Sequence, residues 1–423
     1  METNRANNLI VLEDKFGAHN YHPLPVVLAK GEGVFVWDVD GKKYFDFLSA
    51  YSAVNQGHCH PRITEALIDQ AKTLALTSRA FYNDSLGEYE KYVTNLFGFD
   101  KVLPMNTGAE AVETAIKLCR KWAYEKKGIE ENKAVIVVCE GNFHGRTTTI
   151  ISFSSDPDSN KNFGPYAPGF LSIPYDDIPA LEKALKLPNV VGFLVEPIQG
   201  EAGVYTPSDD YISRARNLCT ENGALFIADE VQTGIGRTGS LLGVCGNCTC
   251  EHSCERQKNT YNRPDILILG KALSGGVYPV SAVLADDEIM LVIKPGQHGS
   301  TFGGNPIAAK VAIAALEAVN DEKLIQNARK LGVFFRSEMN RIISKSDLVL
   351  KVRGKGLLNA IVVNDSETGK TAWNLCLALK ENGLLAKPTH GNIIRFAPPL
   401  IITKEQITEC IEIIEKTLKS FKK

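Results

Sequence analysis

Side chains capable of chemistry follow directly after three short apolar runs of the chain. They are Phe143 and Arg146 after residues 134–139, Asp229 after residues 224–228, and Lys271 after residues 266–269. In open sheets of parallel strands, ligands bind at the carboxyl ends of the strands. We therefore expect an aromatic ring, a guanidinium, a carboxylate and an amine to meet at one edge of a sheet.

A lysine and a carboxylate at such an edge suit the chemistry of pyridoxal phosphate. The Lys271 amine can form a Schiff base with the cofactor aldehyde, and the glycines at 270–276 leave room for the ring. A carboxylate beside the pyridine nitrogen keeps that nitrogen protonated, a role that fits Asp229. Taken alone, Lys271 could be a solvated surface residue and Asp229 a helix N-cap. Their combination with the glycine-rich flank favours a pyridoxal-phosphate site.

Two segments offer hydrogen-bond donors to the phosphate of that cofactor. Residues 106–109 open a helical stretch, so the free N–H groups of Gly108 and Ala109 would face an anion at the positive end of the helix dipole. Residues 298–306 add the hydroxyls of Ser300 and Thr301. A Thr-Gly helix start is common, so the first segment alone is a weak signal.

Alternating helical and apolar segments must position these residues. A helical repeat covers residues 105–122, and a second covers 211–222. Between such helices lie continuous apolar runs at 134–139, 190–195, 224–228, 266–269 and 281–285. Runs that are apolar on both faces and separated by helices are typical of a parallel sheet covered on both sides. The sequence therefore predicts an α/β core with a mostly parallel sheet.

The two ends of the chain differ from this core. Amphipathic helices are predicted at 322–343 and 404–421, with strands near 348–352, 357–363 and 393–396 between them. Residues 33–37 and 43–47 flank Asp40-Gly41 and predict a hairpin. We predict an N-terminal arm at 1–56, a large cofactor-binding domain at 57–321, and a small α+β domain at 322–423.

Composition limits the classes of protein that the chain can belong to. The chain has 423 residues, and its 47 Lys and Arg nearly balance its 49 Asp and Glu, which argues against a nucleic-acid-binding surface. No apolar run approaches the roughly 20 residues that cross a bilayer. The N-terminus carries Glu2, Glu13 and Asp14 and lacks the pattern of a signal or transit peptide. We expect a cytoplasmic protein.

The 10 cysteines are too few for a disulfide scaffold, but four lie close together. Cys245, Cys248, Cys250 and Cys254 stand near His252, and this spacing matches no standard zinc motif. A reduced surface loop, a zinc site and redox-controlled pairing all stay open. Adjacent residues make poor tetrahedral ligands, so we expect no metal at His58-Cys59-His60.

Several segments resemble the class III aminotransferases, from about Phe16 to the C-terminus. They are FGAHNYHP at 16–23, DFLSAYSAVNQGHCHP at 46–61, NTGAEAVETAIKLCRKW at 106–122, EPIQGEAGV at 196–204, ADEVQTGIGRTG at 228–239, LGKALSGGVYPVSAVLA at 269–285 and HGSTFGGNP at 298–306. The resemblance implies the fold type I of pyridoxal-phosphate-dependent transferases. It departs at 243–261, where the spacer holding the four cysteines is about a dozen residues longer than the family's usual one.

The resemblance also implies roles for the cofactor-binding residues. Lys271 matches the Schiff-base lysine, and Asp229 matches the partner of the pyridine nitrogen. Gln232 would lie beside the ring hydroxyl, and Phe143 would stack on the ring. Gly108, Ala109 and Ser300 would bind the phosphate. Thr301 would do so in the neighbouring subunit, which implies a homodimer with shared active sites.

The first two matched segments point to the ornithine-using members of the family. That resemblance implies transfer of the δ-amino group of L-ornithine to 2-oxoglutarate, with Tyr21, Tyr51, Arg146, Glu201 and Arg395 in the substrate pocket. Arg146 and Arg395 would bind carboxylates, and Glu201 would pair with Arg395. Acetylornithine and 4-aminobutyrate are alternative amino donors. An aminomutase and a non-catalytic binding protein are more distant alternatives, and the intact pairing of Lys271 with Asp229 argues against the second.

Overall fold

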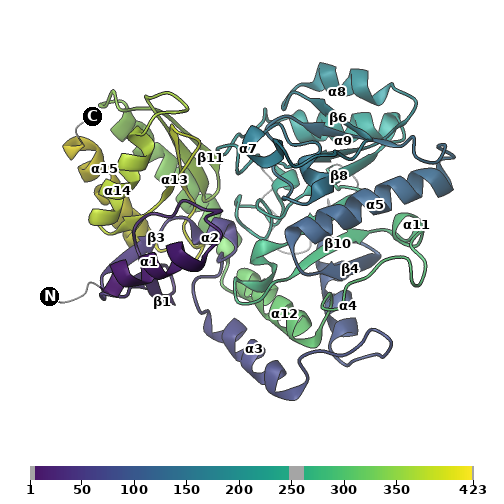
Figure 1. Cartoon of the computed structure of the whole chain (residues 1–423), viewed down its shortest axis with the longest axis horizontal. Coiled ribbons are helices and arrows are strands. Elements are labelled where there is room, and N and C mark those ends of the chain that lie inside the picture. The colour runs from purple at the N-terminus through teal and green to yellow at the C-terminus, as the bar shows by residue number, and fades with distance from the viewer. Residues whose placement is uncertain (1–4, 247–261, 422–423) are drawn as a thin grey trace.

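The computed structural model describes residues 5–246 and 262–421, arranged as two lobes (Figure 1). The larger lobe contains a seven-stranded sheet in the order β4-β10-β9-β8-β7-β5-β6. Its strands are β4 (Lys101–Met105), β5 (Val135–Cys139), β6 (Phe170–Ile173), β7 (Val190–Val195), β8 (Leu225–Asp229), β9 (Ile266–Leu269) and β10 (Ser281–Ala285). Strands β6, β5, β7, β8 and β9 run parallel, which confirms the predicted α/β core.

Strand β10 corrects one expectation, because it runs antiparallel to both of its neighbours, β9 and β4. Its sequence, SAVLA, is buried along its whole length like that of its parallel neighbours, so composition does not reveal its direction. The connection from β9 contains only the short 3-10 helix η2 (Lys271–Ser274). A parallel partner would need a longer crossover, usually with an α-helix, and the chain instead turns back directly.

Helices cover both faces of this sheet. Alternate residues of the strands face two separate cores, as Ile227 and Phe226 of β8 illustrate. The core on the Ile227 side includes α5 (Gly108–Lys126) and α11 (Asp287–Met290). The core on the Phe226 side includes α4 (Leu86–Phe97), α8 (Ile178–Leu185), α9 (Tyr211–Glu221) and α12 (Pro306–Asp321). Burial on both faces explains why the strands are continuous apolar runs.

Capping places the start of α5 at the edge of the sheet. Thr107 and Glu110 form a reciprocal capping box, and Gly108 is the first helical residue. The sequence repeat suggested a helix from residue 105, but Met105 ends β4. Helix α3 (Pro61–Thr73) packs along α12, and the short helices α6 (Thr148–Ile151) and α7 (Pro157–Asn160) follow the loop after β5.

The smaller lobe combines the two ends of the chain (Figure 1). One sheet, in the order β11-β12-β15-β14, consists of β11 (Val349–Lys355), β12 (Leu358–Val363), β14 (Lys387–Thr389) and β15 (Ile393–Phe396). Its helices are α13 (Leu324–Ile343), α14 (Thr371–Glu381) and α15 (Lys404–Ser420). Elements α13, α15, β11, β12 and β15 match the predicted C-terminal helices and strands to within a few residues, whereas α14 and β14 were not predicted.

The predicted N-terminal hairpin is present and joins the C-terminal elements. It consists of β2 (Phe35–Asp38) and β3 (Lys43–Asp46), preceded by α1 (Arg5–Phe16) and β1 (Leu28–Glu32). Strand β3 pairs in parallel with β13 (Leu384–Leu385), so the hairpin extends a sheet that both chain ends share. The domain limits at 56/57 and 321/322 stay predictions.

Within the described residues, no helix is both long and apolar enough to cross a membrane. Cys248, Cys250, His252 and Cys254 lie outside the described residues, so the three readings of the cysteine-rich insertion stay open. Its first cysteine, Cys245, ends the 3-10 helix η1 (Gly243–Cys245).

Candidate active site

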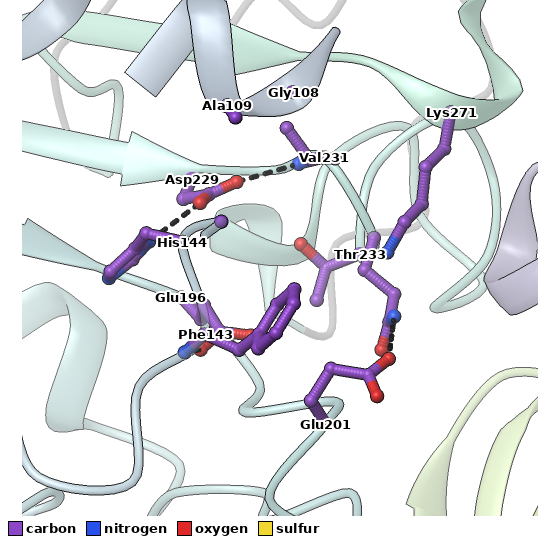
Figure 2. Close-up of a pocket in the computed structure, with 12 residues that line it drawn as sticks. Gly108, Ala109, Phe143, His144, Glu196, Glu201, Asp229, Val231, Thr233 and Lys271 are labelled. Atoms are coloured by element: carbon purple, nitrogen blue, oxygen red, sulfur yellow. Dashed lines mark hydrogen bonds and ion pairs between the residues drawn. The ribbon is translucent and has the colours of Figure 1, made fainter. Parts of the chain in front are cut away.

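A cavity of about 200 Å³ lies where the strands β5, β7, β8 and β9 end beside the N-terminus of α5 (Figure 2). Its lining residues are Gly108, Ala109, Phe143, His144, Gly145, Glu196, Glu201, Asp229, Val231, Gln232, Thr233 and Lys271. The fold thus brings the predicted lysine, carboxylate, aromatic ring and helix start together at one edge of the sheet.

Lys271 begins η2 directly after β9, with a φ of 44°. Figure 2 shows its side chain reaching into the pocket toward Thr233 and Glu201. Burial lowers the pKa of the Lys271 amine, while the Glu201 carboxylate acts in the opposite direction. A lowered pKa increases the share of neutral amine at a given pH, and the neutral amine is the nucleophilic form.

Asp229 ends β8 and is held from two sides. One of its carboxylate oxygens accepts a hydrogen bond from the Val231 N–H at 3.1 Å, and the other accepts one from His144 Nδ1 at 2.6 Å. Burial acts to lower the pKa of His144, but the hydrogen bond and charge of Asp229 outweigh it and raise that pKa. The imidazole and the carboxylate therefore form a buried pair whose geometry is set by the sheet edge.

Two further carboxylates have opposite electrostatic environments. Burial raises the pKa of Glu196 to about 7, although its oxygens accept hydrogen bonds from the Phe143 N–H at 2.8 Å and the Gly200 N–H at 3.3 Å. Burial also disfavours ionised Glu201, but the positive charges of Arg395 and Lys271 prevail and lower its pKa to about 2. Glu201 is thus a permanent anion at neutral pH.

Glu201 connects the cavity to the smaller lobe. Its Oε1 accepts hydrogen bonds from Arg395 Nη1 at 2.6 Å and from Gln232 Nε2 at 3.1 Å. Arg395 lies on β15 and is only 3% exposed. Its guanidinium carbon is 5.2 Å from the centre of the Tyr51 ring. Tyr21 lies further out and is 69% exposed.

Arg146, Ser300 and Thr301 do not line this cavity within the described chain. Arg146 is exposed, with its guanidinium carbon 5.6 Å from the Phe143 ring centre. Ser300 Oγ accepts a hydrogen bond from Asn106 Nδ2 at 2.8 Å, close to the start of α5. Ser300 and Thr301 border a second cavity. Their predicted contacts with the phosphate stay predictions.

The residues of the cavity fit a pyridoxal-phosphate ring. Gln232 Oε1 is buried and has no hydrogen-bond partner among the described residues. A Cβ on Gly108 would lie 3.0 Å from the side chain of Val231, which also lines the cavity. Glycine at this position therefore avoids a close contact at the cavity wall. Gly108 and Ala109 are in the first turn of α5, where N–H groups have no intrahelical acceptor. An anion at the helix start, a ring beside Asp229 and an aldehyde near Lys271 match these groups.

Sequence reasoning missed several lining residues, among them His144, Glu196 and Val231. Glu196 directly follows the apolar run of β7, just as Lys271 and Asp229 are associated with the ends of β9 and β8. The rule that ligands bind at strand ends could have found it. His144 stands beside Phe143 in the loop after β5, but no sequence signal pairs it with Asp229.

The histidines near Cys59 have carboxylate partners. His58 Nε2 lies 2.7 Å from Asp46 Oδ2, and His60 Nε2 lies 2.7 Å from Glu322 Oε1. Across residues 5–246 and 262–421, no group of three or more His, Cys, Asp or Glu side chains is arranged to hold a metal ion.

Known proteins are similar to this chain over nearly its full length. A protein named mitochondrial ornithine aminotransferase, from Drosophila ananassae, is 62% identical over 96% of this chain and 90% of its own. A crystal structure described as the acetylornithine aminotransferase of Elizabethkingia anophelis is 62% identical, with a TM-score of 0.88 over 98% of this chain and 99% of that chain. The ornithine aminotransferase of Toxoplasma gondii, described with partial occupancy of PLP at its active site, is 47% identical, with a TM-score of 0.92 over 98% of this chain and 94% of that chain.

The family described as aminotransferase class-III matches residues 16–418. That match includes the cavity and both lobes. The chain belongs to the class III aminotransferase family, with the pyridoxal-phosphate-dependent fold type I.

Proposed function

We propose that the protein transfers the δ-amino group of L-ornithine to 2-oxoglutarate with pyridoxal phosphate as cofactor, giving glutamate-5-semialdehyde and glutamate. The observation that carries the proposal is the ion pair between Glu201 and Arg395 beside the cavity. One pocket must accept ornithine, with one carboxylate and two amines, and then a keto acid with two carboxylates. An arginine that a neighbouring carboxylate can neutralise serves both substrates.

The cofactor residues have separate tasks. When bound, pyridoxal phosphate supplies a ring that absorbs the negative charge developing on the substrate carbon. Lys271 anchors the cofactor and moves the proton at that carbon. Asp229, oriented by His144, keeps the pyridine nitrogen protonated, and Gln232 hydrogen-bonds the ring hydroxyl. Phe143 packs against the ring.

The phosphate contacts in this proposal involve two chains. Gly108, Ala109 and Ser300 bind the phosphate within one chain, and Thr301 contributes to the site of a second copy. The support for the second part is that Thr301 is exposed and borders a cavity separate from that of Lys271. We therefore propose a homodimer with shared active sites.

The substrate residues explain why the δ-amine reacts. While Glu201 occupies Arg395, the α-carboxylate of ornithine is directed outward to Tyr21 and Arg146, and the δ-amine points to Lys271. 2-Oxoglutarate brings a carboxylate that displaces Glu201 from Arg395, and Arg146 receives its second carboxylate. Tyr51 packs beside Arg395 while Glu201 is paired with it.

Acetylornithine is the second candidate amino donor, because the similar structure from Elizabethkingia anophelis is described as an acetylornithine aminotransferase. Initial rates with ornithine, N-acetylornithine and 4-aminobutyrate, each with and without 2-oxoglutarate, test the assignment. Ornithine should have the highest kcat/KM and should require the keto acid. A higher kcat/KM with N-acetylornithine would replace the proposal with the second candidate, and turnover without any keto acid would indicate a mutase.

We propose a cytoplasmic location for the protein. The relative from Drosophila ananassae is named mitochondrial. Fractionation of the source cells, with detection of the protein in each fraction, distinguishes the two locations.

A further inference from the structure

A second basic side chain lies beside Arg395 at the mouth of the site. Lys387 is on β14 and is directly paired with Arg395 on β15 in the antiparallel register. Side chains of directly opposite residues point to the same face of a sheet, with Cβ atoms about 4.5–5.5 Å apart. Lys387 therefore projects on the same side as Arg395, toward the active site.

The contacts of Lys387 place its amine among the predicted substrate residues. Its Nζ donates a hydrogen bond to the Tyr51 hydroxyl at 3.4 Å. The same Nζ lies 5.7 Å from the centre of the Tyr21 ring. Tyr51 thus has the Arg395 guanidinium near its ring and the Lys387 amine at its hydroxyl. The two tyrosines and the two basic residues form one outer cluster, which we call the mouth cluster.

The two cations of this cluster differ in whether a carboxylate is paired with them. Arg395 is 3% exposed and is paired with Glu201. Within residues 5–246 and 262–421, by contrast, no carboxylate oxygen lies within ion-pairing distance of Lys387 Nζ. Lys387 is partly exposed, so it retains hydration without such a partner. When Glu201 covers Arg395, Lys387 is the mouth-cluster cation whose charge is still available.

We propose that Lys387 determines specificity by attracting the carboxylate at the end of the substrate far from the reacting amine. This inference rests on the proposed function and deepens it. The Glu201–Arg395 pair controls whether a carboxylate can bind near the cofactor. Lys387 instead favours amines that carry a carboxylate at the end far from the cofactor. A diamine of the same length without a carboxylate gains nothing from Lys387. The residue is therefore a selector for amino acids over simple diamines.

The test compares ornithine with 1,4-diaminobutane, which is ornithine without its carboxylate. Lys387→Met removes the charge and keeps much of the side-chain volume, and Lys387→Arg keeps the charge. Tyr51→Phe removes the hydroxyl that Lys387 contacts and leaves the charge in place. Lys404→Met is the matched control, because Lys404 also lies over an aromatic ring, 5.5 Å from the centre of Phe334, but belongs to α15. Single-turnover absorbance of the holoenzyme measures slow substrates.

Lys387→Met should lower kcat/KM for ornithine about tenfold, a typical loss for one charge-assisted contact, and change the value for 1,4-diaminobutane less than twofold. Lys387→Arg should retain at least a third of the wild-type preference, and Lys404→Met should be unchanged. The Kd of glutarate, a dicarboxylate that cannot react, should rise about tenfold in Lys387→Met by calorimetry. If the wild type does not use ornithine, the proposed function is refuted. The binding of glutarate still tests the role of Lys387 in that case.

Equal losses with ornithine and 1,4-diaminobutane, or an unchanged Kd for glutarate, would overturn the proposal. The same conclusion follows if Tyr51→Phe reproduces the whole loss of preference, because Lys387 would then act only by positioning Tyr51. A salt titration gives an independent readout. Raising the ionic strength screens an exposed cation, so KM for ornithine should rise more steeply with salt in the wild type than in Lys387→Met.

Discussion

Replacing Glu201 by alanine should convert Arg395 into a permanently open carboxylate site. The two side chains are 2.6 Å apart, and the pKa of Glu201 is about 2 instead of the ordinary 4.5. This difference corresponds to about 3 kcal/mol in favour of the ionised carboxylate. Arg395 supplies the largest favourable part of this stabilisation, and Lys271 and Gln232 supply the rest. A carboxylate-bearing substrate that enters beside Arg395 must displace the Arg395 part. Less than half of that difference, about 1.4 kcal/mol, is already a factor of about ten in rate or affinity.

The expected result has two parts. Glutamate should react at least about tenfold faster with the Glu201→Ala enzyme, and ornithine should begin to react at its α-amine as well as its δ-amine. Glu201→Gln is the matched control, because it keeps a hydrogen-bond acceptor near Arg395 but removes the negative charge. It should give an intermediate gain. Single-turnover spectroscopy with each amino donor, followed by chromatography of the products, measures both effects.

Stability provides a separate measure of the same pair. Removing one partner of a buried ion pair leaves an uncompensated charge, which costs about 3–5 kcal/mol. Glu201→Ala should therefore lower the Tm, and added glutarate should restore much of the loss by pairing with Arg395. If Glu201→Ala slows the ornithine and glutamate reactions equally, forms no α-product and gains no stability from glutarate, then Glu201 has only a structural role and the reasoning is wrong.

Three other substitutions test the site and its support. Lys271→Ala should abolish turnover while circular dichroism shows a folded protein, and substantial steady-state activity would exclude Lys271 as the anchor. Burial raises the pKa of Glu196 to about 7, so the folded chain binds more protons than the unfolded chain between pH 4.5 and 7 and loses stability as pH rises through that window. Glu196→Gln should flatten this decline in a denaturation series, and an unchanged slope would contradict it. Arg237→Met should lower the free energy of unfolding by about 3 kcal/mol, because the fully buried guanidinium donates to Asn55 Oδ1, Leu357 O and Pro398 O. Urea titration measures this loss, and a change of less than about 1 kcal/mol would contradict the prediction.

Much of the sheet could be predicted because its strands are buried on both faces. The predicted runs at 190–195, 266–269 and 281–285 coincide with β7, β9 and β10. Strand direction was harder, since a buried strand has the same composition in either direction, and β10 was placed wrongly in the parallel set for that reason. The pairing of β3 with β13 was also beyond the sequence, because it joins two short segments from opposite ends of the chain.

The cofactor half of the site was easier to predict than its supporting contacts. Asp229 and Lys271 stand at strand ends, where the fold dictates that ligands bind. The partner of Asp229 could not be predicted in this way, because His144 comes from another loop. Only the folded chain brings His144 Nδ1 within 2.6 Å of the Asp229 carboxylate. Sequence patterns report periodicity and local spacing, and they contain little information on contacts between loops.

The backbone at Tyr51 has a conformation that the sequence did not reveal, although the family resemblance did point to the residue. Four consecutive non-glycine residues, which form α2 (Ser49–Ser52), have φ values of 49°, 46°, 59° and 71°. This left-handed conformation costs roughly 1–2 kcal/mol per residue. The segment contains no glycine from which it could have been predicted.

Two polar groups offset that cost and direct the turn toward the site. Asp46 Oδ1 accepts hydrogen bonds at 2.9 Å from the N–H groups of Leu48 and Ser49. The Ser49 hydroxyl donates to the carbonyl of Ala397 at 2.7 Å, just beyond the end of the strand that carries Arg395. The strained turn is therefore fixed to the same segment as the guanidinium that its tyrosine contacts. We propose that this supported strain holds the Tyr51 ring beside Arg395 for substrate binding.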